Sequence, residues 1–211
     1  MRAPDSPSPD LVHEREASVL GLVAGVDEAG CAPLAGPVVA AAVVLDFRHV
    51  PEGINDSKKL SAERREELYG EIAGACLGWA VGIADVARID AVNILNARLW
   101  AMAEAVRALS AAPAVALVDG NRAPKLSCET RLIVGGDARS LSIAAASIIA
   151  KVTRDRLMCA LDIECPGYGF SRHKGYGTPE HQRALRELGP SIHHRRSFAP
   201  VRQMAFVFAA E

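Results

Sequence analysis

Short apolar runs, separated by polar or glycine-rich segments, recur along this chain. Runs at 22–26, 38–45 and 79–84 predict three early strands that are buried on one or both faces. Further runs at 114–118 and 132–134 repeat the pattern later in the chain. We therefore expect a sheet whose strands come from both halves of the sequence.

Helical periodicity fills the spaces between these runs. Ser61, with acidic residues in the turns that follow, predicts a capped helix to about Ala75. Asp90 is predicted to cap a longer helix with a core-facing apolar stripe. A long helix with a basic polar side is expected over 141–161, and a short one over 179–188. The pattern indicates the α/β class, with a mixed sheet flanked by helices.

The composition fits one domain with two tails. The chain has 211 residues, of which 50% are hydrophobic and 23% charged, as in ordinary globular proteins. Residues 1–18 are rich in proline, serine and charge without periodicity. We therefore predict a flexible N-terminal tail at 1–18, a folded domain at 19–202 and a C-terminal tail at 203–211.

Cysteine usage and hydropathy argue against secretion and membrane insertion. The five cysteines are scattered and form no Cys-x-x-Cys pair, so neither a disulfide framework nor a zinc site is predicted. The first residues lack the apolar run of a secretion signal, and the run at 38–45 is far too short to cross a bilayer. We expect a cytoplasmic protein.

Acidic residues follow three of the apolar runs. Asp27 and Glu28 end the first, Asp119 ends another, and Asp137 lies one loop after a third. Strand ends are where ligands bind in open α/β sheets, and acids gathered there repel one another unless a cation neutralises them. Oxygen ligands suit Mg²⁺ or Mn²⁺, which promote phosphodiester hydrolysis. The alternative is that these aspartates merely cap turns.

Basic residues gather in the last third of the chain, although the whole chain has a net charge of -1. Over 172–202 there are seven lysines and arginines against two glutamates, with four histidines in addition. The segment 167–178 interleaves aromatic and basic residues, so that Tyr168 is placed to stack on a sugar or base while Arg172 and Lys174 meet phosphates. A solvated surface loop is the alternative.

The order of these motifs resembles the ribonuclease HII family over about residues 20–202. The segments that carry the resemblance lie at 25–30, 33–37, 56–60, 118–120, 136–137, 142–155, 168–170, 173–178 and 196–198. The resemblance implies an RNase H-like fold, with a five-stranded mixed sheet flanked by helices and a helical C-terminal extension that clamps the substrate.

The resemblance also implies a metal-dependent endoribonuclease that cuts the RNA strand of RNA–DNA hybrids, and ribonucleotides embedded in duplex DNA, leaving 3′-hydroxyl and 5′-phosphate ends. Two Mg²⁺ or Mn²⁺ ions and a monomeric enzyme are expected. The family's metal carboxylates correspond to Asp27, Glu28, Asp119 and Asp137, and its substrate-contacting tyrosine to Tyr168. The implied phosphate contacts are Lys58, Lys59, Ser147, Lys151, Thr153 and Arg154.

One segment departs from the family pattern. Where the family has a Gly-Arg-Gly loop that reads the 2′-hydroxyl at an RNA-to-DNA junction, this chain has Gly30, Cys31 and Ala32. The arginine's charge is lost, and Ala32 adds a Cβ where glycine lets the backbone approach a sugar. We expect hybrid cleavage to survive and cutting at a single embedded ribonucleotide to be weakened, or its site preference to be relaxed.

Two alternatives remain open at this point: an RNase H-fold nuclease without junction specificity, and a hybrid-binding protein with little turnover. A nucleotide-dependent enzyme is disfavoured because no phosphate-binding glycine loop follows the first strand. The segment 203–208 loosely resembles peptides that dock on replication sliding clamps, although a terminal segment packed on the domain is the simpler interpretation.

Overall fold

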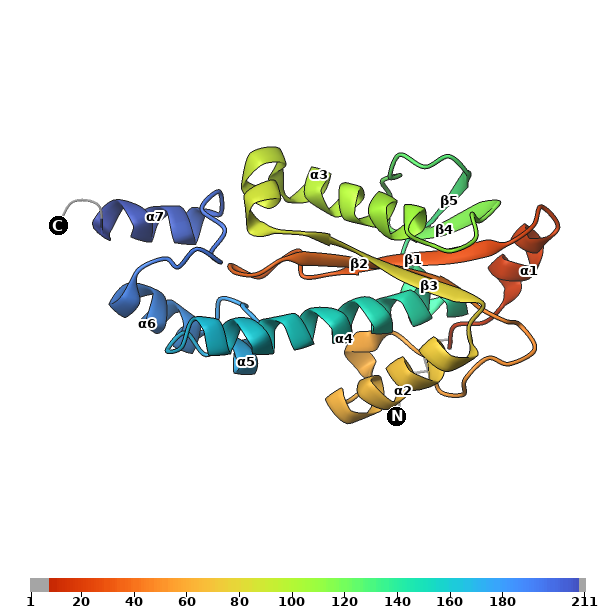
Figure 1. Ribbon diagram of the computed structural model, residues 1–211, viewed down its shortest axis with the longest axis horizontal. Helices are drawn as coiled ribbons and strands as arrows, with labels where there is room; N and C mark the ends of the chain where they lie inside the picture. The colour runs from red at the N-terminus through yellow and green to blue at the C-terminus, as the bar shows by residue number, and fades with distance from the viewer. Residues whose placement is uncertain (1–7, 209–211) are drawn as a thin grey trace, which may run out of the picture.

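Within residues 8–208, which the computed structural model describes, five strands form one mixed sheet (Figure 1). The strands are β1 (Val23–Ala29), β2 (Val38–Val44), β3 (Gly78–Ala84), β4 (Val115–Asp119) and β5 (Glu129–Ile133). Their order is β3-β2-β1-β4-β5. β2 runs antiparallel to β1 and β3, whereas β4 runs parallel to β1 and β5. The predicted mixed sheet is confirmed.

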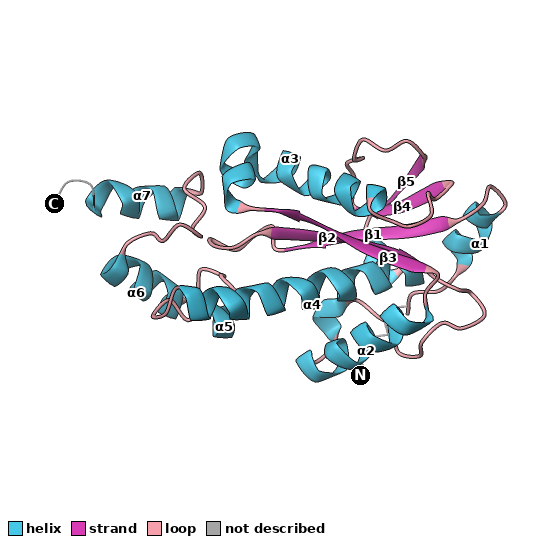
Figure 2. Cartoon of the chain, in the orientation of Figure 1, coloured by secondary structure: helices cyan, strands magenta, loops and turns pink. Residues whose placement is uncertain are grey.

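Helices cover both faces of this sheet (Figure 2). They are α1 (Val12–Ser18), α2 (Ala62–Ala75), α3 (Val86–Arg107), α4 (Leu141–Glu164), α5 (Phe170–His173), α6 (Pro179–Leu188) and α7 (Ala199–Phe208), with short 3₁₀ turns η1 (Ser57–Lys59) and η2 (Gly136–Ala138). Ser61 caps α2 as predicted, because its side chain accepts from the backbone N–H of Arg64 at 3.2 Å.

The strands send alternate side chains into two helical layers. Val26 and Ala24 pack with α3, while Ala41 of the neighbouring β2 packs with α2 and α4 on the other face. α4 lies so close to β1 that a Cβ on Gly25 would stand 2.1 Å from the carbonyl carbon of Ser142. Glycine is therefore required there. By the same alternation, residue 27 faces α4 and residue 28 faces α3.

The predicted N-terminal tail is wrong for residues 12–18, which form α1. Glu14 is fully buried, and its Oε1 accepts from Ser140 Oγ at 2.5 Å and from Ser142 N at 2.8 Å. These partners lie at the N-terminus of α4, where a negative charge is favoured by the helix dipole. Residues distant in the sequence hold this segment in place, so its local composition did not predict the helix. Residues 1–7 of the predicted tail lie outside the described residues.

Asp90 does not cap the long helix, contrary to the prediction. Asp85 does so, by accepting from the backbone N–H of Arg88 at 2.8 Å. Asp90 instead accepts from the backbone N–H groups of Arg196 and Ser197, each at 3.0 Å. This residue therefore joins α3 to the C-terminal region.

We expect Asp90→Ala to lower the free energy of unfolding by about 1–2 kcal/mol, because two backbone donors and the Ser197 hydroxyl lose their acceptor. The measurement is urea unfolding, with Glu104→Ala on the same helix as the control. Glu104 pairs with exposed Arg107, and its loss should change stability by less than about 0.5 kcal/mol. Equal midpoints for the two variants would contradict the assigned role of Asp90.

α4 continues past the sheet, and α5, α6 and α7 lie around its far end (Figure 1). Leu34, Leu185 and Val201 form an apolar cluster that ties this region to the loop after β1. α7 spans Ala199–Phe208, so the predicted boundary between residues 202 and 203 falls inside a helix and is wrong. Among residues 8–208, no helix combines the length and apolar character needed to cross a membrane.

Candidate active site

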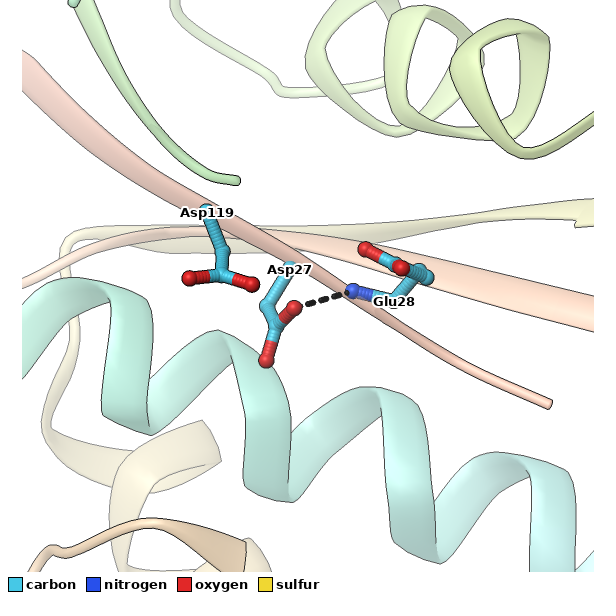
Figure 3. Close-up of side chains that lie close together, drawn as sticks. All are labelled: Asp27, Glu28 and Asp119. Carbon is cyan, nitrogen blue, oxygen red and sulfur yellow. Dashed lines mark hydrogen bonds between the residues drawn. The ribbon is translucent and has the colours of Figure 1, made fainter. Parts of the chain in front are cut away.

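An acidic cluster lies where β1 and β4 end together. Because these strands are parallel neighbours, their C-terminal ends meet at one edge of the sheet. Asp27 and Glu28 come from β1 and Asp119 from β4, and each offers one carboxylate oxygen such that all three oxygens lie within 4.8 Å of one another. Figure 3 shows Asp27 pointing toward α4, with Asp119 beside it.

Backbone amides hold two of these carboxylates in place. Asp27 Oδ1 accepts from the N–H of Glu28 at 2.7 Å, the bond drawn in Figure 3. Asp119 Oδ1 accepts from the N–H of Gly136 at 2.7 Å. In each aspartate one oxygen is fixed and the other remains available to a ligand.

The electrostatics of the cluster favour a cation. Burial raises the pKa of Asp27 well above its usual range, and the charges of Glu28 and Asp119 raise it further. Burial also raises the pKa of Asp119. Glu28 Oε2 is buried and has no hydrogen-bond partner in the described part of the chain. A hard divalent cation would satisfy this oxygen and offset the repulsion, so the residues fit such an ion.

Asp137, the fourth predicted acid, lies next to the cluster without joining it. It sits in η2, and its Oδ2 accepts from Lys58 Nζ at 3.3 Å. Its charge nevertheless contributes to the raised pKa values of Asp27 and Asp119. The structure thus groups three of the predicted acids closely and keeps the fourth paired with a lysine.

Arg98 was missed by the sequence reasoning. This α3 residue donates from Nη1 to Glu28 Oε1 at 3.0 Å, on the face of β1 opposite to Asp27. Burial alone would lower the pKa of Arg98, but the charge of Glu28 raises it, so the guanidinium stays charged. No spacing in the sequence points to it, because it occupies a polar position of an amphipathic helix 70 residues away.

The loop with Gly30, Cys31 and Ala32 borders the cluster. Gly30 has a φ of 98°, which favours glycine. The Cys31 thiol donates to Glu28 Oε1 at 3.5 Å, and burial beside Glu28 raises the pKa of this thiol to about 12. Ala32 is exposed. The loop therefore contacts the cluster through a neutral thiol.

A second residue missed by the sequence reasoning fixes the path of this loop. Arg195 is fully buried and donates to the carbonyls of Gly30 at 2.6 Å, Cys31 at 2.9 Å, Gly36 at 2.8 Å and Pro37 at 3.3 Å. The sequence placed Arg195 among the basic residues of a surface, since nothing local indicates burial. It instead ties the C-terminal region to the loop after β1.

The comparison with known families agrees with this arrangement of acids and loop. Residues 24–201 match the model of the family described as Ribonuclease HII. The chain belongs to the ribonuclease HII family. A relative from Parvibaculum lavamentivorans, named Ribonuclease HII, is 59% identical over 198 residues, which cover 93% of this chain and 73% of the relative. The predicted family and RNase H-like fold are confirmed.

Two solved structures are similar. Ribonuclease H2 from Pyrococcus horikoshii has a TM-score of 0.74 and 28% identity, covering 90% of this chain and 99% of that one. A ribonuclease HII from Archaeoglobus fulgidus, solved in a complex with PCNA, has a TM-score of 0.70 and 30% identity, covering 82% of this chain and 93% of that one. The chain is accordingly a metal-dependent endoribonuclease that cleaves the RNA strand of RNA–DNA hybrids.

Two predicted phosphate contacts are corrected by the structure. Arg154 is 1% exposed and donates to the carbonyls of Pro37, Lys174 and Ala35, so its guanidinium holds loops together. Ser147 is 3% exposed and donates to the carbonyl of Ala144 within its own helix. Burial in tertiary packing removes both side chains from a substrate surface.

Tyr168 is also placed differently from the prediction. It is 7% exposed, stacks on Phe170 with ring centroids 5.2 Å apart and donates its hydroxyl to the carbonyl of Gly189 at 2.7 Å. The tyrosine of this segment that lies at the surface is Tyr176, which is 44% exposed. The predicted stacking role of Tyr168 is therefore not supported by its surroundings.

The other predicted contacts remain accessible in part. Lys58 and Lys59 are exposed at η1. Lys151 is half-buried and donates to Asp155 at 2.8 Å. Arg172 is exposed and paired with Glu180, and the remaining two, Thr153 and Lys174, are half-buried.

Three of the histidines counted with the basic region are buried instead. His181 Nε2 lies 3.0 Å from His194 Nε2, and the ring of His173 stacks on His181 with centroids 4.4 Å apart. Burial, together with the neighbouring histidines, lowers the pKa of His194 to about 3. These side chains therefore form a buried core for the C-terminal region, in which His194 is neutral.

We expect a pH-dependent contribution from His194. Its pKa is about 3 when folded against 6.5 when unfolded, so below about pH 6.5 the unfolded chain binds more protons and stability falls. The stability advantage of the natural protein over His194→Gln should shrink by roughly 1 kcal/mol per pH unit between about pH 6.5 and 5. Urea unfolding at several pH values measures this. A difference that stays flat over this pH range would contradict it.

Proposed function

We propose that Asp27, Glu28, Asp119 and Asp137 hold the divalent cations with which this ribonuclease cleaves RNA. The observation that carries the proposal is the convergence of three carboxylate oxygens within 4.8 Å at the end of β1 and β4. The raised pKa of Asp27, caused first by burial and then by the charges of Glu28 and Asp119, supports it. We expect two ions, Mg²⁺ or Mn²⁺, because paired metal sites suit phosphodiester hydrolysis.

The chain's own residues prepare the site. Bound cations would supply positive charge that ionises the acids, activates water and offsets the charge developing on the scissile phosphate. The amides of Glu28 and Gly136 each fix one aspartate oxygen at 2.7 Å, which leaves the second oxygen oriented. Lys58 balances the charge of Asp137 from 3.3 Å and stands 80% exposed, where it can meet a phosphate. The reaction needs no side-chain nucleophile.

The substrate backbone would be bound by side chains that are exposed or half-buried. We propose phosphate contacts from Lys58, Lys59, Lys151, Thr153, Arg172 and Lys174. Thr153 Oγ1 is buried without a hydrogen-bond partner among the described residues, which supports a contact completed by the substrate. Tyr176, which is exposed, is a better stacking candidate than Tyr168.

Cleavage at single embedded ribonucleotides would depend on the loop at 30–32. Arg195 fixes the carbonyls of Gly30 and Cys31, which supports a defined backbone path for contact with a 2′-hydroxyl. The arginine of the family pattern is absent at position 31. We therefore propose full activity on RNA tracts and reduced activity at a lone ribonucleotide.

The test compares cleavage of a labelled tract hybrid and a one-ribonucleotide duplex, in Mg²⁺ and in Mn²⁺. We expect rapid cleavage of the tract hybrid and slower cleavage of the one-ribonucleotide duplex. The Cys31→Arg/Ala32→Gly variant should cleave the one-ribonucleotide duplex faster than the natural protein does. Binding without cleavage in either metal would overturn the catalytic proposal. Equal rates for the natural and double-variant proteins on the one-ribonucleotide duplex would overturn the loop proposal.

A weak sliding-clamp contact through 203–208 is a further proposal, supported by the similarity to the ribonuclease HII solved with PCNA. These residues belong to α7, whose first turn packs Val201 into the domain. The test is clamp binding by the monomer we expect, before and after deletion of 203–211. Unchanged binding would refute the contact.

A further inference from the structure

Glu28 receives two donors on the same oxygen. Arg98 Nη1 lies 3.0 Å and Cys31 Sγ 3.5 Å from Glu28 Oε1, while Glu28 Oε2 is buried without a partner in the described chain. Two donors on one oxygen restrict rotation of the carboxylate and direct its second oxygen. Arg98 and Cys31 therefore act on the orientation of a proposed metal ligand.

Arg98 also differs from the other arginines around this end of β1. Arg195 donates from Nε, Nη1 and Nη2 to backbone carbonyls, and Arg154 does the same. The side chain of Arg98 makes one hydrogen bond among the described residues, to Glu28, and its Nε is buried without a partner. Its side chain is 22% exposed.

A purely structural ion pair does not explain these unpaired atoms. An unsatisfied buried donor or acceptor costs about 1–3 kcal/mol, so buried pairs normally complete their hydrogen bonds. Here both partners, Arg98 and Glu28, keep one buried atom without a partner in the described chain. An incomplete pair beside an acidic cluster indicates that a ligand completes it.

The local structure of α3 presents Arg98 to the cluster. Asn93 has a φ of 67° and interrupts the helix, and its Oδ1 accepts from the N–H of Asn96 at 3.1 Å. Asn93 thereby acts as the cap of a new helical segment, whose second turn contains Arg98. The interruption changes the direction of the chain just before Arg98 meets Glu28.

We propose that Arg98 orients Glu28 and binds a backbone phosphate of the nucleic acid beside residue 31, in place of the arginine that the family pattern has in that loop. The inference rests on the proposed function of the acidic cluster. A guanidinium suits both partners, because its planar fork donates to a carboxylate and a phosphate at once.

The experiment uses Arg98→Ala, Arg98→Lys and Cys31→Arg alone and combined with Arg98→Ala, with Arg107→Ala on the same helix as the control. Thermal melting first confirms that each variant is folded. Binding of a short labelled hybrid is measured by anisotropy in EDTA, so that no cleavage occurs, over a series of salt concentrations. Single-turnover cleavage is then measured in Mg²⁺.

Loss of one phosphate contact should reduce the slope of log binding constant against log salt by about 0.9 in Arg98→Ala. Arg98→Lys should retain the slope, Cys31→Arg should restore it in the Arg98→Ala background, and Arg107→Ala should not change it. Cleavage by Arg98→Ala should fall about 10- to 100-fold, as for a lost charged contact in a transition state. A structural role alone would not give rescue by Cys31→Arg.

An unchanged salt slope in folded Arg98→Ala, or no rescue by Cys31→Arg, would overturn the assignment of Arg98. Failure of the proposed function looks different, because the natural protein would then bind the hybrid and cleave it in neither metal. In that case the salt slope in EDTA still decides whether Arg98 contacts a phosphate.

Discussion

Asp27→Asn is expected to lower single-turnover cleavage of an RNA–DNA hybrid by about 1000-fold or more and, without metal, to raise the stability of the protein. The substitution removes one charge from the proposed cation site but keeps the shape of the side chain. Metal sites supply several kcal/mol of transition-state stabilisation, and each 1.4 kcal/mol corresponds to about a tenfold change in rate.

The sign of the stability change follows from the pKa of Asp27. Its folded pKa is raised above 3.8 by burial and by Glu28, so above that pH the folded state binds more protons than the unfolded chain. Stability of the metal-free protein therefore falls as pH rises through the folded pKa. Asp27→Asn lacks this contribution, and its advantage should grow across the same pH range.

Single-turnover cleavage measures the change in rate, and thermal melting with and without Mn²⁺ measures the change in stability. Mn²⁺ should raise the melting temperature of the natural protein more than that of the variant, because a ligand that binds the folded state stabilises it. Glu129→Gln, at an exposed position of β5, is the matched control and should change neither quantity. Full cleavage activity in Asp27→Asn would refute the role of the cluster.

Arg195→Ala is expected to lower the free energy of unfolding by about 3–5 kcal/mol, the largest stability effect considered for this chain. The guanidinium is fully buried, and its loss leaves the carbonyls of Gly30, Cys31, Gly36 and Pro37 without this donor. Arg195→Lys should recover little of the loss, because a single ammonium cannot reproduce the planar array of donors.

Urea unfolding followed by tryptophan fluorescence measures this loss. The neighbouring Arg196 has an exposed side chain, so Arg196→Ala should change stability by less than about 0.5 kcal/mol. Hybrid cleavage by Arg195→Ala, at a temperature where it remains folded, should fall most at a lone ribonucleotide, since Arg195 fixes the loop at 30–32. A midpoint equal to that of Arg196→Ala would show that the buried contacts contribute little.

Much of the fold could be predicted because its signals are local. The apolar runs that became β1, β2 and β4 and the cap at Ser61 are properties of a few consecutive residues, and backbone hydrogen bonding converts them into strands and a helix. Asp90 shows the limit of such signals. Two aspartates lie five residues apart, and only the packing of the C-terminal region shows which one caps the helix.

The acids of the site were predictable for the same reason, while their neighbours were not. Asp27, Glu28 and Asp119 end apolar strands, and the rule that parallel strands end at one edge brings them together. Glu14, Arg154 and Tyr168 carry no local sign of burial. Each has a hydrogen-bond partner between 20 and 128 residues away along the chain. The local sequence does not show these partners, so it assigned the three residues to a tail or a surface.

The sequence by itself determined the α/β sheet, the family and the acids that end its strands, because periodicity and motif order can be read directly from consecutive residues. Tertiary structure alone decided that Arg98 reaches Glu28, that Arg195 fixes the loop at 30–32, and that three histidines are buried together. The physical reason is that desolvation and pairing of charges depend on which segments are in contact in the folded protein, and the spacing of residues in the sequence does not specify those tertiary contacts.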